Sequence, residues 1–392
     1  MRILIVSPTL PYLPCHDAAR LLPANLLVHL GDRHTLALVA ATAPGDTPPQ
    51  RRWAASLVEH AEIVTAGRWR EPITGAPGPG LAALEAAVVR AIERFGPDVV
   101  HLEGGLLAPL AGMREVPTVL AAHGSGALDA REARRVTRRP WRRIRARLRE
   151  RRETAWERRW FTAAAACVVG SDDDRQELTR HLPAEAVRVI PAGIDARQYA
   201  FRTTGEPGRL VFTGALDRPR DAEAARRLAT RILPLVRRLH PRAELLIVGG
   251  SPPSAIRALG ALPGVRVTGL APDRRMSVWS AAVYMSPLAA GFGAKERLLE
   301  SMALGTPIVA SHRSLSGLAE VLPGHHVLTA ETNDEFAVAA LELMREPIVA
   351  QTIARNARAL VERRYTWPAI VRRYDALYTQ VPEAARPAVR AA

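Results

Sequence analysis

Short, continuously apolar runs alternate with longer amphipathic stretches through the first half of the chain. The runs are Ile3–Val6, Leu36–Ala40, Ile63–Ala66, Val99–Leu102, Val119–Ala122, Cys167–Gly170 and Val187–Ile190. Candidate helices such as Ala18–Leu30 and Leu81–Phe95 lie between them. Strands that are apolar on both faces are typical of a parallel sheet covered by helices on each side, so the pattern predicts an α/β fold.

The second half of the chain repeats this alternation. Its apolar runs are Leu210–Thr213, Leu245–Val248, Val265–Gly269, Val283–Ser286, Ile308–Ala310 and Val327–Thr329. Two alternations within 392 residues indicate two doubly wound, parallel-sheet domains. We place the first at residues 1–200 and the second at residues 201–367, because Phe201–Gly208 has the composition of a linker.

The stretch Tyr284–Ser311 predicts a strand, a glycine-containing loop, a helix and a second strand. Gly291 and Gly293 stand in the loop, and the helix begins at Lys295. Glycines let the backbone approach a ligand closely, and the N–H groups at the start of a helix favour an anion such as phosphate. Glu300, on the same helix, can accept paired hydrogen bonds from the vicinal hydroxyls of a ribose.

Lys295 is the only lysine among the 54 Lys and Arg residues. A coding bias toward arginine accounts for the other cations. The exception therefore indicates a position that needs a compact ammonium rather than a planar guanidinium. Chance is the alternative explanation.

The segment Gly291–Ser311 (GFGAKERLLESMALGTPIVAS) resembles the nucleotide-sugar site of retaining GT-B glycosyltransferases, the family 4-like or "group 1" sugar transferases. The resemblance implies two Rossmann-like domains that face each other across a cleft. It also implies a nucleotide diphosphate sugar as co-substrate. Many relatives have a second glutamate where this chain has Phe292. The role of that glutamate is taken here by the backbone, by Lys295 or by no group at all.

The resemblance supplies candidate site residues. In the second, donor-binding domain they are Gly214, Leu270, Gly291, Phe292, Gly293, Ala294, Lys295, Leu299 and Glu300. In the first, acceptor-binding domain, His123 follows Val119–Ala122, where the family has a histidine that contacts the donor sugar. A strand-end histidine bonded to backbone is the alternative. The candidates for catalysis are His123, Lys295 and Glu300.

Three residues are candidates for the acceptor side of the site. Asp17 and Arg20 lie in the segment that matches the family's first loop, and Glu103 follows the run Val99–Leu102. A salt bridge is an equally good explanation for Glu103. The stretch ERRYTWPAIVRRYDALY resembles the family's terminal helix, which we expect at about residues 368–385, packed back onto the first domain.

The net charge of +15 is concentrated in Arg131–Trp160, which contains 14 arginines and 4 glutamates. Trp141, Ile144, Leu148, Trp156 and Trp160 recur there at helical spacing or its multiples. A basic amphipathic helix of this kind can hold a peripheral enzyme on an anionic membrane surface. The same stripe packed on its own domain, with arginines in water, fits equally well. Charge alone indicates non-specific association, so we do not expect a nucleic-acid partner.

Cys15 and Cys167 are far apart in the sequence, which argues against a disulfide framework and favours a cytoplasmic protein. Peripheral attachment at the inner face of the plasma membrane would fit the basic segment. No apolar run approaches the ~20 residues that span a bilayer.

Together these features predict a metal-independent, retaining glycosyltransferase of the hexosyltransferase type. The acceptor would be a saccharide, a lipid-linked or another small molecule, as in cell-envelope polysaccharide biosynthesis. No cofactor is expected, because Lys295 and the loop amides can stabilise a departing diphosphate without a metal. A nucleotide-sugar epimerase of the same fold is the alternative, although it needs additional acid and base groups. A basic nucleic-acid-binding protein is a weaker one.

Overall fold

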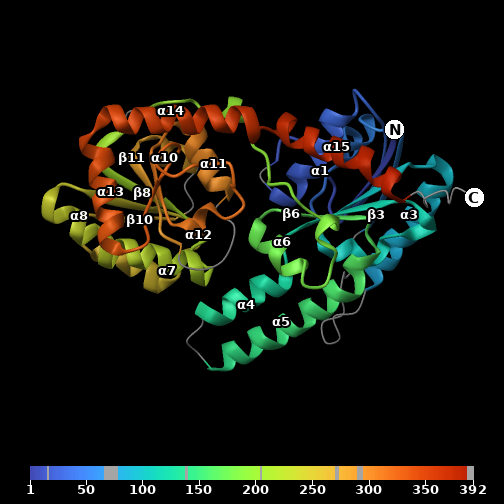
Figure 1. Cartoon of the computed structure of the whole chain (residues 1–392), viewed down its shortest axis with the longest axis horizontal. Coiled ribbons are helices and arrows are strands. Elements are labelled where there is room, and N and C mark those ends of the chain that lie inside the picture. The colour runs from blue at the N-terminus through green and yellow to red at the C-terminus, as the bar shows by residue number, and fades with distance from the viewer. Residues whose placement is uncertain are drawn as a thin grey trace, which may run out of the picture. The chain divides into compact units, whose positions relative to one another are not determined.

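The structure is a computed structural model that describes residues 1–15, 17–65, 78–136, 140–203, 205–269, 273–288 and 295–385 (Figure 1). The chain divides into two compact units. The first comprises Met1–Leu128, Leu148–Pro191 and the C-terminal segment from Trp367, and the second comprises Asp129–Arg147 and Ala192–Thr366. The sequence places the boundary near residue 200, whereas the chain passes into the second unit after Pro191.

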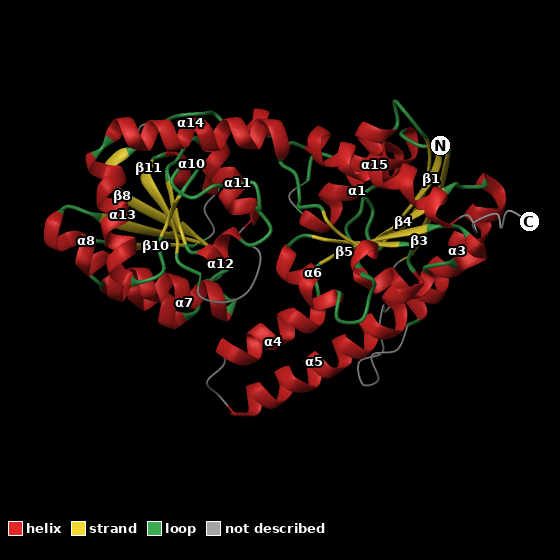
Figure 2. Ribbon diagram, in the orientation of Figure 1, coloured by secondary structure: helices red, strands yellow, loops and turns green. Residues whose placement is uncertain are grey.

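The first unit is built on a parallel sheet of seven described strands in the order β3-β2-β1-β4-β5-β6-β7. Figure 2 draws the strands in yellow. The strands are β1 (Arg2–Ser7), β2 (Thr35–Thr42), β3 (His60–Thr65), β4 (Val99–Glu103), β5 (Thr118–His123), β6 (Ala166–Val169) and β7 (Val187–Val189). The helices of the first unit are α1 (Ala18–Leu30), α2 (Pro48–Ser56), α3 (Pro79–Phe95) and α6 (Asp172–Leu178). The helices α4 (Gly126–Val136) and α5 (Pro140–Trp160) each have residues in both units, because Asp129–Arg147 belongs to the second. The C-terminal segment adds α15 (Trp367–Ala385).

Both faces of this sheet are buried, which explains the continuous apolar runs. Side chains of a strand alternate between its two faces. Ile3 and Ile5 therefore pack in one core, whereas Leu4 and Val6 pack in the other. The predicted α/β arrangement is confirmed for this part of the chain.

The terminal helix α15 covers one of these two faces. Ile370, Tyr374 and Tyr378 are buried in the same core as Ile3, Ile5 and several α1 side chains. Pro368 stands in its first turn, where a missing N–H has no cost. The last helix of the chain is thus a structural part of the first unit.

The second unit has a parallel sheet of six described strands in the order β10-β9-β8-β11-β12-β13. The strands are β8 (Glu206–Thr213), β9 (Glu244–Val248), β10 (Val265–Thr268), β11 (Ala281–Ser286), β12 (Ile308–Ala310) and β13 (Leu328–Thr329). The helices are α7 (Pro219–Arg227), α8 (Leu233–Leu239), α9 (Ser254–Arg257), α10 (Arg274–Trp279), α11 (Lys295–Leu304), α12 (His312–Leu315), α13 (Asn333–Arg345) and α14 (Pro347–Arg364). The second predicted parallel sheet is therefore confirmed as well.

The basic stretch after Pro140 forms the helix α5, but its apolar positions do not share one environment. Trp156 is buried and its Nε1 donates to the carbonyl of Gly105 at 3.0 Å. Trp141, Ile144 and Leu148 are instead 50%, 62% and 51% exposed. Only the end of the helix near Trp156 packs into the core of the first unit.

Candidate functional site

The start of α11 follows β11 at the carboxyl edge of the second sheet, where ligands of parallel α/β sheets bind. The helix begins at Lys295, as the sequence predicts. Its first-turn N–H groups lack partners within the helix and favour an anion. Leu270, Gly291, Phe292, Gly293 and Ala294 lie outside the described residues, as does the side chain of Lys295.

Glu300 is held on α11 by two partners. Arg274 Nη2 lies 2.6 Å from Oε1 and Arg274 Nε lies 3.2 Å from Oε2, which makes a two-point ion pair. The Tyr199 hydroxyl donates to Oε1 at 3.2 Å. Burial and the neighbouring Glu300 charge raise the pKa of Tyr199 well above its usual value, so this hydroxyl keeps its proton. The Glu300 carboxylate is 14% exposed and can meet a ligand.

The neighbouring candidates Leu299 and Gly214 have structural roles. Leu299 is fully buried in the core of the second unit and sets the orientation of α11 beside Glu300. A Cβ at Gly214 would lie 2.9 Å from the Phe212 ring and 3.1 Å from Asp221 Cβ. Glycine is therefore needed here for packing at the end of β8, whether or not a ligand also approaches it.

A buried ion pair joins α11 to α7, next to the end of β8. Asp221 Oδ2 accepts from Arg297 Nη2 at 3.0 Å and from the Ala215 amide at 2.7 Å, and Asp221 is 1% exposed. Arg297 Nη1 also donates to the Thr213 carbonyl at 3.0 Å. This pair fixes the carboxyl edge of the sheet relative to the helix that carries Lys295 and Glu300.

In the first unit, His123 and Glu103 lie together at the carboxyl ends of β5 and β4. His123 Nε2 is 2.5 Å from Glu103 Oε1, and His101 Nε2 is 3.1 Å from Glu103 Oε2. Burial raises the pKa of Glu103, but the charge of His123 and the hydrogen bonds from both imidazoles outweigh it and lower that pKa to about 2. The ion-pair alternative for Glu103 is thus the one that the structure contains.

A second buried carboxylate supports the turn after His123. Glu157 of α5 accepts from Ser125 Oγ at 2.9 Å and from the Ala127 amide at 3.1 Å, at the start of α4. Burial, with the nearby charge of Glu153, raises the pKa of Glu157 to about 7 even though these hydrogen bonds oppose the shift. The basic helix therefore contributes a side chain to the strand end that carries His123.

The two remaining acceptor-side candidates are engaged within the first unit. Asp17 caps α1 by accepting from the Ala19 amide at 3.1 Å. Arg20 Nη1 donates to Asp46 at 2.8 Å and to the Leu10 carbonyl at 2.9 Å. Asp17 is the more exposed of the two.

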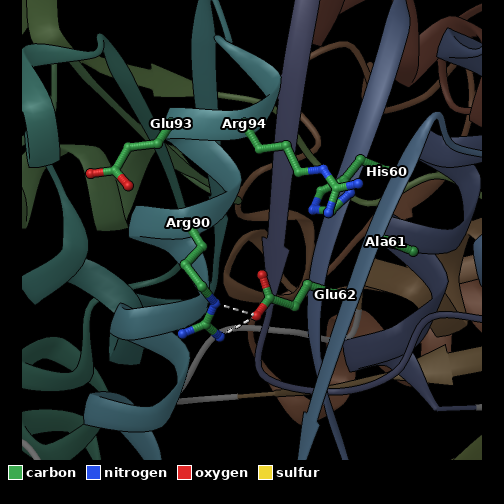
Figure 3. A pocket seen from close by; sticks show the side chains of 6 residues that line it. All are labelled: His60, Ala61, Glu62, Arg90, Glu93 and Arg94. Carbon is green, nitrogen blue, oxygen red and sulfur yellow. Dashed lines mark hydrogen bonds and ion pairs between the residues drawn. The ribbon is translucent and has the colours of Figure 1, made fainter.

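A shallow hollow of about 600 Å³ lies elsewhere in the first unit, between β3 and α3 (Figure 3). It is lined by His60, Ala61, Glu62, Arg90, Glu93 and Arg94. In Figure 3 the Arg90 guanidinium reaches Glu62 across it. His60 is the first residue of the edge strand β3, so the hollow is remote from the carboxyl ends of the strands and we assign it no role in the site.

The sequence predicts Lys295, Glu300 and His123 as site residues but does not identify Arg274 and Tyr199 as partners of Glu300. These two side chains reach Glu300 only in the folded unit. The sequence did carry one signal for Asp221, because it occupies the first turn of a helix close after Gly214.

Within the described residues, no group of three His, Cys, Asp or Glu side chains could hold a metal ion. No helix in the described ranges is long and apolar enough to cross a membrane.

Two family profiles match the chain. "Glycosyltransferase Family 4" matches residues 24–198, and "Glycosyl transferases group 1" matches residues 207–346. The first match falls on strands and helices of the first unit and the second on the unit that carries Glu300.

Curated relatives are similar over part of the chain. The phosphatidyl-myo-inositol mannosyltransferase of Mycobacterium leprae is 30% identical over 237 residues, 57% of this chain and 61% of the relative. That of Mycobacterium tuberculosis strain H37Rv is 32% identical over 235 residues, 55% of this chain and 59% of the relative. The chain thus spans about three fifths of the length of the curated relatives it matches.

Solved structures are similar over nearly the whole chain. Sucrose-phosphate synthase from Thermosynechococcus elongatus has a TM-score of 0.69 at 19% identity, covering 98% of this chain and 99% of that one. Anabaena HepE in complex with UDP-glucose has a TM-score of 0.64 at 16% identity, covering 97% and 100%. WaaG, a glycosyltransferase involved in lipopolysaccharide biosynthesis, has a TM-score of 0.62 at 15% identity, covering 97% and 99%. At these identities the similarity concerns the fold.

Proposed function

Because the chain belongs to the group 1 glycosyltransferases and has their GT-B fold, we propose that it moves a sugar from a nucleotide diphosphate sugar to an acceptor. The acceptor class is a saccharide, a lipid-linked or another small molecule. The observation that carries the proposal is α11, which starts with Lys295 at the carboxyl edge of the second sheet and carries the partly exposed Glu300.

Groups on α11 and on the loop before it bind the diphosphate and the ribose of the donor. Lys295 and the amides around Gly291–Gly293 stabilise the charge that develops on the departing diphosphate, without a metal. Glu300 accepts hydrogen bonds from the ribose hydroxyls. Among the similar structures, HepE is described as a complex with UDP-glucose, which supports a sugar nucleotide as the ligand class.

Transfer breaks the bond between the anomeric carbon and the phosphate oxygen and forms one from that carbon to the acceptor oxygen on the same face. The departing phosphate oxygen takes the acceptor proton, so no protein nucleophile is required. His123 of the first unit orients the donor sugar. The anomeric configuration is retained.

The exposed apolar side chains of α5 support a membrane-bound acceptor. Trp141, Ile144 and Leu148 are spaced three and four residues apart, so they share one helix face among arginines. Such a face enters the interface of an anionic bilayer. The curated relatives are named phosphatidyl-myo-inositol mannosyltransferases, and a phosphatidyl lipid is a membrane component. The enzyme therefore works as a peripheral protein at the cytoplasmic membrane face.

A thermal-shift screen against UDP-, GDP- and ADP-sugars tests the proposal. A ligand at 100 times its Kd stabilises the folded chain by about 2.7 kcal/mol, so one donor class should raise the unfolding temperature clearly. Incubation with that donor alone should give slow hydrolysis. No shift with any sugar nucleotide would refute the proposal, and an epimerised donor would favour the epimerase instead.

A further inference from the structure

His101 and Glu103 form the buried end of β4. Residues two apart in a strand point to the same face, so both side chains approach the same neighbours. Glu103 pairs with Ala121 of β5 in the parallel register and is only 2% exposed. Its carboxylate is therefore shielded from solvent and contacts the imidazoles of His101 and His123.

The backbone of β5 turns His123 toward this carboxylate. Between Ala121 and His123 the strand advances two residues against one residue of β6, from Val168 to Val169. Such a bulge re-aims a side chain at a strand end. His123 also has φ +63°, a left-handed conformation that is unfavourable for a residue with a side chain. The bond to Glu103 is an interaction that can hold this conformation.

The cluster continues to the last helix of the chain. Tyr378 Oη of α15 lies 2.8 Å from His101 Nδ1, and both residues are fully buried. Burial, with the charges of neighbouring groups such as Glu103, raises the pKa of Tyr378 well above its usual value. The hydroxyl therefore keeps its proton and can donate it to His101, whose other nitrogen faces Glu103.

These contacts determine where the protons lie. An ionised carboxylate only accepts hydrogen bonds, so each imidazole must present a protonated Nε2 to Glu103. In the neutral tautomer of His101 that carries its proton on Nε2, Nδ1 accepts the Tyr378 hydroxyl. In this arrangement Tyr378 donates to His101, and His101 donates to Oε2 of Glu103. His123 donates to Oε1 of the same carboxylate.

We propose that Glu103 is a positioning residue that fixes the orientation of His123 and keeps its proton on Nε2, and that His101 and Tyr378 hold Glu103 for this task. The inference rests on the proposed function only for its effect on the reaction. A carboxylate behind a histidine sets tautomer and ring orientation in many sites without touching substrate. The C-terminal helix α15 thus helps to position His123, through the contact of Tyr378 with His101.

The first test is Glu103→Gln. The two imidazoles face different oxygens of Glu103, and in glutamine one of these oxygens is replaced by an NH2 group that only donates. The imidazole that faces this group can no longer donate to residue 103. We expect the ring ¹⁵N and hydrogen-bonded N–H signals of His101 or His123 to change in NMR spectra of the whole chain. We also expect kcat to fall about 10²-fold, with donor Kd nearly unchanged, because a misplaced reacting group costs that much. Unchanged ring signals and kcat would overturn the inference.

Tyr378→Phe against Tyr374→Phe gives a matched second test if Glu103→Gln does not fold. Tyr378 contacts His101 through its hydroxyl. Tyr374 packs against the same imidazole in a T-shaped arrangement, with 5.7 Å between the ring centroids. Tyr378→Phe should shift the ring signals of His101 and His123, and Tyr374→Phe should leave them in place. Equal effects of the two variants would contradict the inference. The NMR readout needs no substrate, so a chain without sugar-nucleotide affinity would refute the proposed function but still decide this point.

Discussion

Arg274 and Glu300 form a two-point ion pair with distances of 2.6 and 3.2 Å, and the same carboxylate accepts the Tyr199 hydroxyl. A carboxylate has about four lone-pair directions, of which these partners use three. The vicinal hydroxyls of a ribose need two. If Glu300 binds the ribose as proposed, the donor displaces at least one of these three contacts.

Arg274→Ala should consequently leave donor Kd within about fivefold of the unsubstituted chain. The Arg274 side chain is half exposed, and exposed ion pairs contribute about 1 kcal/mol or less. Isothermal titration of the donor measures the change. A loss as large as that of Glu300→Ala would mean that the guanidinium, and not the carboxylate, binds the donor.

Lys295→Ala and Glu300→Ala should each weaken donor binding by about tenfold to a hundredfold, since a hydrogen bond to a charged group contributes about 1.5–3 kcal/mol. The donor-induced thermal shift measures this loss. Lys295→Arg should recover only part of the affinity if a compact ammonium is required. Circular dichroism provides the check that the variants are folded, and donor affinity that survives in both alanine variants would refute the site assignment.

Asp221→Ala should lower the free energy of unfolding by about 3 kcal/mol, because it leaves the Arg297 guanidinium without its buried partner. Denaturant unfolding measures this loss. The matched control is Glu223→Ala on the same helix, whose ion pair with Arg226 is exposed and should matter little. Similar losses of unfolding free energy in the two variants would contradict the conclusion that the buried ion pair stabilises the fold more than the exposed one.

Glu157 predicts a pH dependence of stability. Its pKa is raised from 4.5 to about 7 in the folded chain, so between these values the folded state binds more protons than the unfolded state. The contribution of Glu157 to the free energy of unfolding is then fully present below pH 4.5, and about 3 kcal/mol of it is lost as pH rises through 7.

Glu157→Gln removes this titration. Relative to the unsubstituted chain, the free energy of unfolding of Glu157→Gln should therefore increase as pH rises from 4.5 to 7. Glu85→Gln, at an exposed position of α3, is the control. A difference that stays constant across this window would contradict the assignment.

Replacing Trp141, Ile144 and Leu148 together by serine should weaken binding to anionic vesicles at least tenfold, because each buried apolar side chain contributes about 1.5–3 kcal/mol. Co-sedimentation with phosphatidylglycerol vesicles measures the change. Ile348→Ser, at an exposed position of α14, is the control. Equal binding of the triple variant would place the membrane contact elsewhere or exclude it.

Local patterns were enough to predict both sheets and the start of α11. Alternate residues of Arg2–Ser7 pack into different cores, and that requirement is visible as a continuous apolar run. The beginning of a helix after a glycine-containing sequence is also a local signal, which is why the sequence predicts the start of α11 at Lys295 correctly. These features depend on residues close together in the chain.

The partners of the site residues were decided only by the tertiary structure. Glu103 meets His123 because β4 and β5 are neighbours in register, and His101 meets Tyr378 across 277 positions of sequence. Spacing along the chain does not encode such contacts, since they depend on strand order, on a bulge and on where the last helix packs. For the same reason the sequence could not show that the apolar stripe of α5 is buried at Trp156 and exposed at Trp141.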